Sequence, residues 1–443
     1  MLIRVGLPED DKLILFGDII LGGRKYDSLE VFSDSDKPLK VKFAVFKNSQ
    51  TGKVFGKIFK FRWELVDIVD NISHAYELAK NINGEFRVWV EGWGGNLRVK
   101  TDKGEWVVDS PLRIRNGGTI TIKNLWVGRG FHWQNKRDLK FLGDFDIYAW
   151  GDKVKAVNIV DIKDYIASVI GSEMIPKVPY EALKAQALAA RTNLFRTAGS
   201  HHPNEPYDIC SEDHCQVYLG LERVSHETLK VSEETDGEII TFNGEPIEAR
   251  YSKCCGGVME RFSVVWGGDD KPYNMNLYDG EGNGLKDISS EEGFESFLNQ
   301  GDAFCNINFP GIENLYRWEI IYSKRDLLES LGRFFKIEKI FGFEGIKRGY
   351  SGRIYEMKVL TDKGDITLKG EYFIRWVFGK PFLPSSAFKI YQKGDGFVLK
   401  GMGWGHGVGM CQMGAIGMAL KGYNYVDIVQ HYYPGVDVIR WKL

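Results

Sequence analysis

The sequence has 443 residues, of which 43% are hydrophobic, so it can build sizeable cores and is not wholly disordered. Lys and Arg number 58 against 60 Asp and Glu, a balance that gives no electrostatic reason to expect nucleic acid or an anionic membrane as a partner. No apolar run approaches the length of a membrane-spanning helix. The 51 glycines and 13% aromatic residues favour many tight turns, so the sequence predicts an α+β, β-rich architecture with more than one domain.

Residues 1–125 are predicted to form a β-rich module with one helix. Hydrophobic residues alternate with polar ones, as they do in half-buried strands, in three segments: residues 39–45, 61–65 and 86–90. Helical spacing over 72–82 predicts a helix before the last of these strands. The acidic residues of the module are scattered and His74 stands alone, so we expect a binding or spacer role here and no chemistry.

Residues 126–443 form the second predicted domain, whose pattern changes from strands to helices and back. Short strands precede residue 160. Apolar spacing then predicts two helices within about residues 161–199, one over 162–170 that stops at Gly171 and one from Pro179 to about Ala198. The apolar stripe of the second helix consists mostly of small residues, which allows close packing. Strand patterns follow, and the chain ends in a Gly-rich segment and a helix.

A carboxylate lies in the predicted connection between these two helices. The connection reads Gly171-Ser172-Glu173-Met174-Ile175-Pro176, so Glu173 is held between rigid helices and can still face a cleft. If Glu173 lies over the C-terminal end of the preceding helix, the negative partial charge of that end opposes its ionisation. An acid that stays protonated near neutral pH suits general acid catalysis, whereas a capping or salt-bridging glutamate is the structural alternative.

Arg191 follows Ala189-Ala190 on the helix with the small-residue stripe. A guanidinium that emerges from a closely packed helix can bind a carboxylate or a sugar hydroxyl. An arginine on the surface without a ligand is the alternative interpretation.

Cysteine and histidine are concentrated in the segment Cys210-Ser211-Glu212-Asp213-His214-Cys215-Gln216. Cys210, His214 and Cys215 are soft ligands that could hold zinc, with a fourth ligand from the Cys254-Cys255 pair. The spacing matches no standard zinc motif, so a disulfide and buried free thiols stay open as alternatives. A Cys–His nucleophile is less favoured, because adjacent residues of an extended segment point to opposite faces.

Glycine occupies every second position in Gly401-Met402-Gly403-Trp404-Gly405-His406-Gly407. The segment fails the test for a dinucleotide-binding loop, because Val408 stands where the third glycine should fall and no acidic partner follows at the right distance. The pattern predicts a strand or loop without side chains on one face, which another backbone or an extended ligand can approach. Trp404 and His406 would project from the other face.

Taken together, these motifs resemble the sporulation stage II protein D family, also known as the amidase-enhancer family. The resemblance runs in order from about residue 125 to the end, and its segments are Ser172-Glu173-Met174, Pro179 to Thr192, His214 to Tyr218, Tyr251-Ser252-Lys253 with Gly256-Gly257, Arg348 to Arg353, Gly403 to Ala415, and His431 to Gly435. Three positions depart from the family pattern. Ile175 replaces a proline, Asn193 replaces an aromatic residue, and Cys411 replaces a common serine.

The resemblance implies a lytic transglycosylase of peptidoglycan that acts on glycan strands stripped of stem peptides, with Glu173 as its catalytic residue. Residues 126–443 would then be the catalytic domain, and residues 1–125 a wall-binding or spacer module. The expected substrate contacts come from polar and aromatic side chains: Arg191, Tyr251, Lys253, Gln216, Trp404, His406 and Gln412.

The resemblance also bears on metal binding. Some members of the family hold zinc through cysteines and histidines near the position of Cys210, His214 and Cys215. Zinc is therefore a candidate ligand of these three residues, although the expected chemistry requires no cofactor.

In the expected reaction, protonated Glu173 donates to the glycosidic oxygen between N-acetylmuramic acid and N-acetylglucosamine. The same residue then takes the proton of the muramic 6-hydroxyl as that oxygen attacks the anomeric carbon. The product is a 1,6-anhydro sugar and no water is consumed. One acid is then sufficient, whereas ordinary hydrolysis needs two placed carboxylates.

Two other functional classes stay open. One is a muramidase-type hydrolase in which Glu173 works with a second acid, for which the nearest candidates are Asp208, Glu212 and Asp213. The other is a non-enzymatic cell-wall binder that recruits or stimulates an amidase. Either reading, like the transglycosylase, has glycan strands as partner, and a cell-wall amidase is a further expected partner.

The substrate sets the expected location. Peptidoglycan lies outside the cytoplasmic membrane, so we expect an extracytoplasmic protein of the cell wall. The sequence enters a strand-like pattern at its first residues and shows no export signal, and we therefore expect a trimmed or mature form. No nucleic acid and no transmembrane segment are expected.

Overall fold

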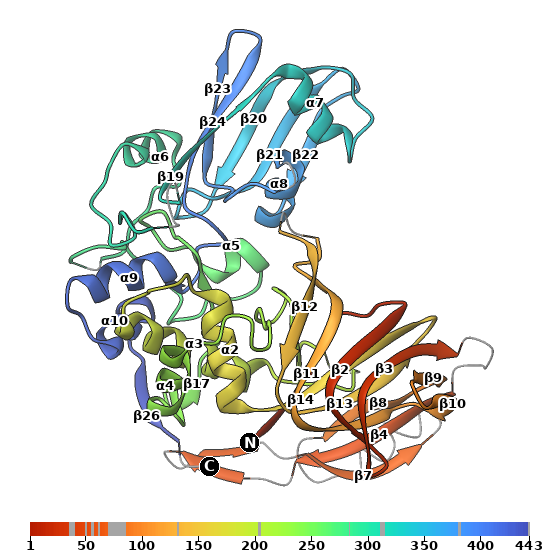
Figure 1. Ribbon diagram of the computed structural model, residues 1–443. Coiled ribbons are helices and arrows are strands. Elements are labelled where there is room, and N and C mark those ends of the chain that lie inside the picture. The colour runs from red at the N-terminus through yellow and green to blue at the C-terminus, as the bar shows by residue number, and fades with distance from the viewer. Residues whose placement is uncertain are drawn as a thin grey trace. The chain divides into compact units, whose positions relative to one another are not determined.

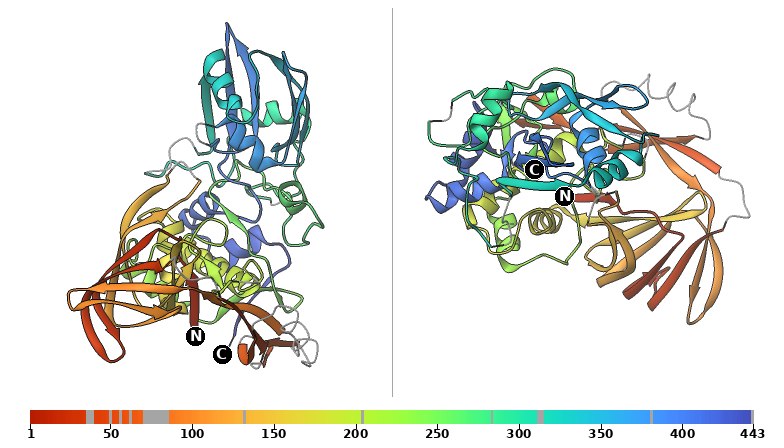
Figure 2. Two further views of the ribbon diagram at one scale, coloured as in Figure 1. Left: turned by 90° about the vertical axis from the view of Figure 1, so that its right-hand side faces the viewer. Right: turned by 90° about the horizontal axis from the view of Figure 1, so that it is seen from above.

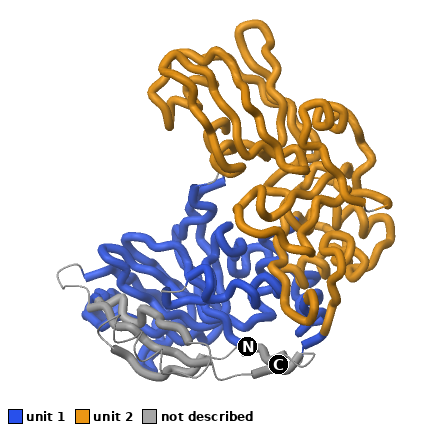
Figure 3. Tube along the Cα trace, turned by 180° about the vertical axis from the view of Figure 1, so that it is seen from behind, with its two compact units in different colours: residues 1–174, 190–239, 440–443 blue, residues 175–189, 240–439 orange. Residues whose placement is uncertain are grey.

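The computed structural model describes the chain except residues 35–39, 49–50, 55–56, 61–62, 70–85, 131–132, 203–204, 283, 311–314, 380–381 and 442–443. The predicted helix over 72–82 lies outside the described residues. Two compact units are present (Figure 3): unit 1 contains residues 1–174, 190–239 and 440–443, and unit 2 contains residues 175–189 and 240–439. These units differ from the predicted division after residue 125, which stays a prediction about function.

Helices and strands are both abundant, which confirms the predicted α+β, β-rich class. The helices within the described residues are α2 (Ile162–Glu173), α3 (Tyr180–Thr197), α4 (His226–Glu234), α5 (Phe262–Trp266), α6 (Glu291–Leu298), α7 (Lys324–Gly332), α8 (Glu371–Phe378), α9 (Gln412–Leu420) and α10 (Tyr425–Tyr432). Across the described part of the chain, none of them is both long and apolar enough to cross a bilayer.

Unit 1 is built on a large sheet (Figure 1, red to yellow), in which β12 (Asn135–Phe141) pairs with β11 off the main path. The other strands follow the order β10 (Gly104–Asp109), β9 (Asn96–Thr101), β3 (Arg24–Asp34), β2 (Lys12–Leu21), β11 (Leu112–Val127), β13 (Asp144–Trp150), β14 (Lys153–Asp161), β1 (Leu2–Gly6) and β15 (Ile209–Cys210). Because β1 pairs antiparallel with β14 and parallel with β15, the end of the sheet carries the segment that begins at Ile209.

Smaller strand pairings lie between residues 40 and 94. The predicted strands over 39–45, 61–65 and 86–90 correspond to elements of one three-stranded sheet, whose order is β7 (Trp63–Val69), β4 (Lys40–Asn48) and β8 (Phe86–Gly94). A further pair consists of β5 (Thr51–Val54) and β6 (Lys57–Lys60).

Helix α2 follows β14 directly, and its first turn is capped by Asp161, whose side chain accepts the backbone N–H of Lys163 at 2.9 Å. The helix does not stop at Gly171, as the sequence predicted, but runs on to Glu173. A Cβ atom at position 171 would lie 2.2 Å from the carbonyl oxygen of Arg223. Glycine is therefore required here for the close approach of a neighbouring backbone, and not as a helix terminator.

Unit 2 contains two three-stranded sheets that share a hydrophobic core with α7 and α8 (Figures 1 and 2, cyan to blue). One sheet has the order β19 (Arg317–Tyr322), β24 (Gly396–Met402) and β23 (Phe388–Lys393), and the other β20 (Ile340–Arg348), β21 (Ile354–Thr361) and β22 (Ile366–Lys369). Leu327 and Leu331 of α7 and Val377 of α8 are fully buried in this core.

Two small sheets complete the described strands. One sheet has the order β17 (Glu245–Pro246), β16 (Glu238–Phe242) and β26 (Asp437–Arg440). The other is a parallel pair of β18 (Tyr251–Ser252) and β25 (Met410–Cys411), which brings the Tyr-Ser-Lys segment beside the end of the Gly-rich segment.

Candidate functional site

Glu173 is the last residue of α2, and its side chain is half-buried. Its Oε1 atom accepts the backbone N–H of Val217 at 3.0 Å. This places the carboxyl group at the helix end rather than in a free loop, which corrects the predicted position. The orientation of the carboxyl group therefore depends on the segment that follows Cys215.

Asp213 belongs to the same electrostatic environment. Its pKa is raised to about 7, first by desolvation of the carboxyl group and then by the negative charge of Glu173. Because Asp213 as a whole is exposed, solvent weakens both effects on its pKa.

The other two predicted partner acids are engaged elsewhere. An oxygen of Asp208 accepts the backbone N–H of Arg4 at 3.0 Å, and Glu212 binds the guanidinium of Arg129 through both oxygens at 3.0 Å. Among the three candidates, Asp213 is the one whose carboxyl group is coupled to that of Glu173.

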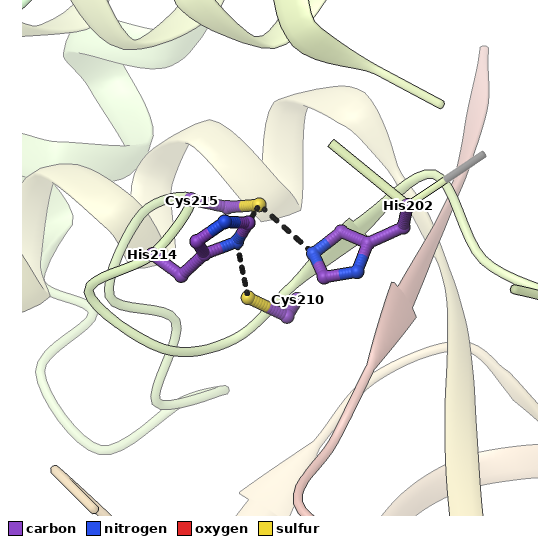
Figure 4. Close-up of side chains that lie close together, drawn as sticks. All are labelled: His202, Cys210, His214 and Cys215. Carbon is purple, nitrogen blue, oxygen red and sulfur yellow. Dashed lines mark hydrogen bonds between the residues drawn. The ribbon is translucent and has the colours of Figure 1, made fainter. Parts of the chain in front are cut away.

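Four side chains lie close together, as Figure 4 shows: His202, Cys210, His214 and Cys215. Their ligand atoms all lie within 4.8 Å of one another. The Sγ atom of Cys215 is 3.4 Å from Nε2 of His202 and 3.7 Å from Nδ1 of His214, which in turn is 3.9 Å from Sγ of Cys210. A tetrahedral zinc with the usual bond lengths needs S···N edges of about 3.6 Å, so the donor set and its size fit zinc.

The fourth member of this cluster was predicted incorrectly. It is His202, and not Cys254 or Cys255, whose thiols belong to unit 2. The sequence did contain a signal, because His201-His202 stand shortly before Cys210, but the distance along the chain is longer than that of a standard zinc motif.

The hydrogen bonds of this cluster favour a thiolate beside an imidazolium. A hydrogen bond with Cys215 is the main reason why the pKa of the Cys210 thiol lies far below its usual value, although burial opposes this shift. Burial alone would lower the pKa of His202, but hydrogen bonds with Cys210 and Glu205 raise it to about 9. Zinc needs deprotonated thiols and neutral imidazoles, so its binding here would release protons.

Arg191 and Gln216 are buried and make internal hydrogen bonds. The guanidinium of Arg191 donates to the carbonyl oxygen of Glu238 at 3.1 Å and to Oγ1 of Thr235 at 3.2 Å. The amide of Gln216 donates to the carbonyl oxygen of Ala190 at 3.2 Å. These contacts favour a structural role for both side chains over the predicted contact with substrate.

In unit 2, the Tyr-Ser-Lys strand and the Gly-rich segment form one structure. Tyr251 pairs with Met410, and the backbones of Cys254 and Trp404 exchange hydrogen bonds at 2.8 and 2.9 Å. The side chains of Tyr251, Lys253 and Trp404 are half-buried. The prediction that glycines let another backbone approach this segment is confirmed, and the approaching backbone is that of residues 250–255.

Arg353 holds the Gly-rich segment in place. Its Nε atom donates to the carbonyl oxygen of Gly405 at 3.1 Å and its Nη1 atom to that of Cys255 at 3.2 Å. A Cβ atom at position 407 would lie 2.4 Å from Nη1 of Arg353, so only glycine fits there. The sequence showed Arg348 to Arg353 as a motif without a role, and the structure supplies one.

His406 is neutral near neutral pH. Burial and the positive charges of Arg250 and Arg353 lower its pKa to about 3. Its Nδ1 atom accepts the backbone N–H of Val408 at 3.0 Å, and its ring lies 4.8 Å from that of Trp266. Nε2 therefore carries the hydrogen and is able to act as a donor.

Gln412 is buried at the start of α9, and its amide donates to Oε1 of Gln186 at 3.2 Å. The side chain thus binds helix α3 within unit 2. As with Gln216, this contact favours a structural role over the predicted contact with substrate.

Comparison with known proteins shows what the chain is similar to. Residues 151–242 match the family model described as stage II sporulation protein, and the chain is 29% identical to stage II sporulation protein D of Bacillus subtilis over 64% of this chain and 76% of that protein. These matches support the resemblance of the chain to the stage II sporulation protein D and amidase-enhancer family. Residues 260–409 match a second model, a domain of unknown function.

Two further relatives extend the comparison. An uncharacterised protein of Brachyspira hyodysenteriae is 29% identical over 69% of this chain and 73% of its own length. The amidase enhancer of Bacillus subtilis is 27% identical over 62% of this chain, which spans only 40% of that relative. The matched segment 151–242 contains Glu173, Asp213 and the whole Cys–His cluster.

Proposed function

We propose that this protein is a peptidoglycan lytic transglycosylase, which cleaves the bond between N-acetylmuramic acid and N-acetylglucosamine and leaves 1,6-anhydro-muramic ends. The family is linked to peptidoglycan degradation. The observation that carries the proposal is the position of Glu173, a half-buried acid that is fixed by the Val217 N–H at the end of a helix in the matched segment. Peptide-stripped glycan strands are the proposed substrate, and the cell wall outside the cytoplasmic membrane is the proposed location.

The proposed mechanism uses one carboxyl group twice. Protonated Glu173 gives its proton to the glycosidic oxygen as the bond to the anomeric carbon breaks. The resulting carboxylate takes the proton of the muramic 6-hydroxyl, whose oxygen forms the new bond to the anomeric carbon. The proton lost in the first half is regained in the second, so the enzyme ends unchanged and no water is used.

Zinc would be held by Cys210, Cys215, His202 and His214, and its proposed contribution is structural. Four protein ligands would close a tetrahedral site and leave no position for substrate. Cys215 lies two residues before Val217, whose backbone N–H binds Glu173. A zinc ion held by these ligands would therefore fix the donor that orients Glu173.

A second candidate function is favoured by Asp213. Its coupling to Glu173 is what a hydrolase with two carboxyl groups would need, with Glu173 as acid and Asp213 as base or nucleophile. In that case a water molecule would enter the product, and the new end would be a free reducing sugar.

The test is product analysis by mass spectrometry on peptide-free glycan strands with wild type, Glu173→Gln and Asp213→Asn. We expect anhydro-muramic ends from wild type, none from Glu173→Gln, and the same anhydro ends from Asp213→Asn. Free reducing ends that disappear in Asp213→Asn would instead establish the hydrolase.

The same experiment tests the role of an amidase enhancer, which the name of one relative suggests. If neither wild type nor Glu173→Gln cleaves the strands but both bind them in a pull-down, the transglycosylase proposal is wrong and the protein is a wall binder. A wall-binding role for residues 1–125 is a separate proposal. Because strands of this range share one sheet with β13 and β14, it is tested by substitution of an exposed side chain such as Phe16→Ala, which should weaken binding, and not by deletion.

A further inference from the structure

Unit 2 contains a second cluster of metal-binding side chains, which the proposed reaction does not use. Cys255, Asp279, Cys305 and Cys411 are buried, and their ligand atoms all lie within 4.8 Å of one another. The residues come from four separate segments of the chain. Cys254, which is also fully buried, is the neighbour of this cluster.

We propose that these four residues form a structural zinc site. Tetrahedral zinc with thiolate ligands requires S···S edges of about 3.8 Å and S···O edges of about 3.5 Å. The Sγ atoms of Cys255 and Cys305 are 3.7 Å apart, and Sγ of Cys255 is 3.2 Å from Oδ2 of Asp279. These two edges are close to those that one zinc ion requires, and the remaining ligand atoms lie within 4.8 Å of one another.

Backbone donors point at the proposed ligands, as expected for sulfur atoms that carry negative charge. Sγ of Cys411 accepts the N–H of Cys255 at 3.2 Å and that of Gly414 at 3.3 Å, and Sγ of Cys255 accepts the N–H of Gly257 at 3.4 Å. Neutral thiols are weak acceptors, whereas thiolates bound to a cation accept such bonds well. This pattern is independent of the distances between the ligands.

Asp279 is oriented by its own partners. Its Oδ2 atom accepts the N–H of Cys305 at 3.1 Å, while Oδ1 accepts the hydroxyl hydrogen of Tyr432 at 2.7 Å. Hydrogen bonds of this kind hold a ligand carboxylate in position around a metal ion. The ring of His431 faces one oxygen of Asp279, with Nε2 3.8 Å from Oδ1. The other oxygen, Oδ2, is buried among sulfur atoms, and a divalent cation would supply positive charge beside it.

A disulfide is the competing state of these thiols. Its sulfur atoms would lie about 2.05 Å apart, so Cys255 and Cys305 would have to approach each other well beyond their 3.7 Å separation. A disulfide also leaves Oδ2 of Asp279 without a metal ion and gives the N–H groups on sulfur poorer acceptors. The geometry therefore favours the metal ion.

The proposed site would join segments that the Gly-rich structure depends on. Cys255 follows the Tyr-Ser-Lys strand, and Cys411 is the residue that caps helix α9. Asp279 and Cys305 lie within residues 260–409, which match the domain of unknown function. A zinc ion would fix the strand and the helix to the same point, as structural zinc sites do.

The test is native mass spectrometry and elemental analysis of the full chain, purified under reducing conditions with added zinc. To isolate this site, the measurement uses the double variant Cys210→Ser/Cys215→Ser, which lacks two ligands of the other cluster. We expect one bound zinc per chain. Replacement by cobalt should give intense sulfur-to-metal absorption in the near ultraviolet, which thiolate ligands cause.

Two added substitutions assign the ligands in this background. Asp279→Asn and Cys305→Ser should each lower the bound zinc to less than about a tenth, while the matched control Cys254→Ser should retain it. Loss of zinc in Cys254→Ser but not in Asp279→Asn would overturn the proposed ligand set. The background variant is also purified without reductant. A mass 2 or 4 Da below the reduced chain, without zinc, would then show disulfides and overturn the site itself; because this readout uses the background variant alone, it does not depend on whether the further variants fold.

Discussion

Two carboxyl groups that interact electrostatically do not ionise independently. Asp213 and Glu173 form such a pair. Its raised pKa means that folded Asp213 keeps its proton to about pH 7, whereas an unfolded aspartate releases it near pH 3.8. Between these values the folded state binds more protons than the unfolded state. By linkage, this contribution to the free energy of unfolding falls as pH rises from about 4 to about 7.

Asp213→Asn should therefore remove part of the pH dependence of stability. We expect the variant to gain stability relative to wild type as pH rises through this window, with little difference at pH 4. Because Asp213 is exposed, the gain should be smaller than the full shift implies. Urea unfolding of both proteins at several pH values measures it, with zinc held constant. Parallel curves for the two proteins would contradict the raised pKa of Asp213.

The buried arginine of α3 shows how the structure changes the interpretation of a single residue. Arg191 was predicted to contact substrate because a guanidinium can bind sugar hydroxyls, and that chemistry is equally suited to backbone carbonyl groups. In the folded chain its hydrogen bonds go to Glu238 and Thr235. The residue type gave the chemistry correctly, but the partner depends on which segment packs against the helix, and no local pattern contains that information.

At the scale of elements, the Gly-rich segment needs glycine for two reasons: the close approach of neighbouring atoms and the left-handed conformation of its backbone. Gly407 has φ +78° and a Cβ there would meet Arg353, whereas Gly422, after α9, has φ +92° and nothing within 4 Å of the added atom. This pair separates strain from packing, because both alanines would suffer the same kind of backbone strain, about 1–2 kcal/mol.

We expect Gly407→Ala to be the more damaging of the two substitutions. Gly422→Ala should cost only the backbone strain, while Gly407→Ala should cost about 2 kcal/mol more, since it also displaces Arg353 from its carbonyl acceptors. Chemical denaturation of both variants gives the difference in midpoint. Equal losses would mean that the approach of Arg353 does not constrain this segment.

The elements of the helical segment were largely predictable, because long periodic patterns specify helices well. Both α2 and α3 were placed within a few residues. The C-terminal end of α2 was not, since Gly171 serves a close contact with Arg223 that belongs to tertiary packing. The same limit applies to His202, which joins Cys210 only because a loop of the fold returns it to that place.

At the scale of the whole molecule, the two clusters show where chain topology determines chemistry. The cluster of unit 1 gathers its ligands from within residues 202–215, whereas the cluster of unit 2 gathers them from distant segments. The sequence predicted three residues of the first cluster from their proximity along the chain. It could not predict the second, because Asp279, Cys305 and Cys411 are far apart and share no motif.

If a zinc ion fixes the segment before Val217, loss of the zinc should disturb the orientation of Glu173 although Glu173 itself is unchanged. We expect Cys215→Ser to lower kcat on peptide-free glycan by about 10–100-fold, the range typical of lost support around a metal, with a smaller change in KM. Cys215→His, which keeps a zinc ligand, should retain more of the rate than Cys215→Ser. Chelation of wild type should reproduce the loss, and added zinc should reverse it.

The comparison with Glu173→Gln separates positioning from chemistry. Cys215→Ser should still yield the same products slowly, because the acid is present but poorly oriented, whereas Glu173→Gln should yield none. The circular dichroism spectrum of Glu173→Gln and its binding to glycan should stay close to those of wild type. Full activity in Cys215→Ser, with zinc absent by elemental analysis, would show that the Val217 N–H reaches Glu173 without help from the Cys–His cluster. The ligand set would then serve stability alone.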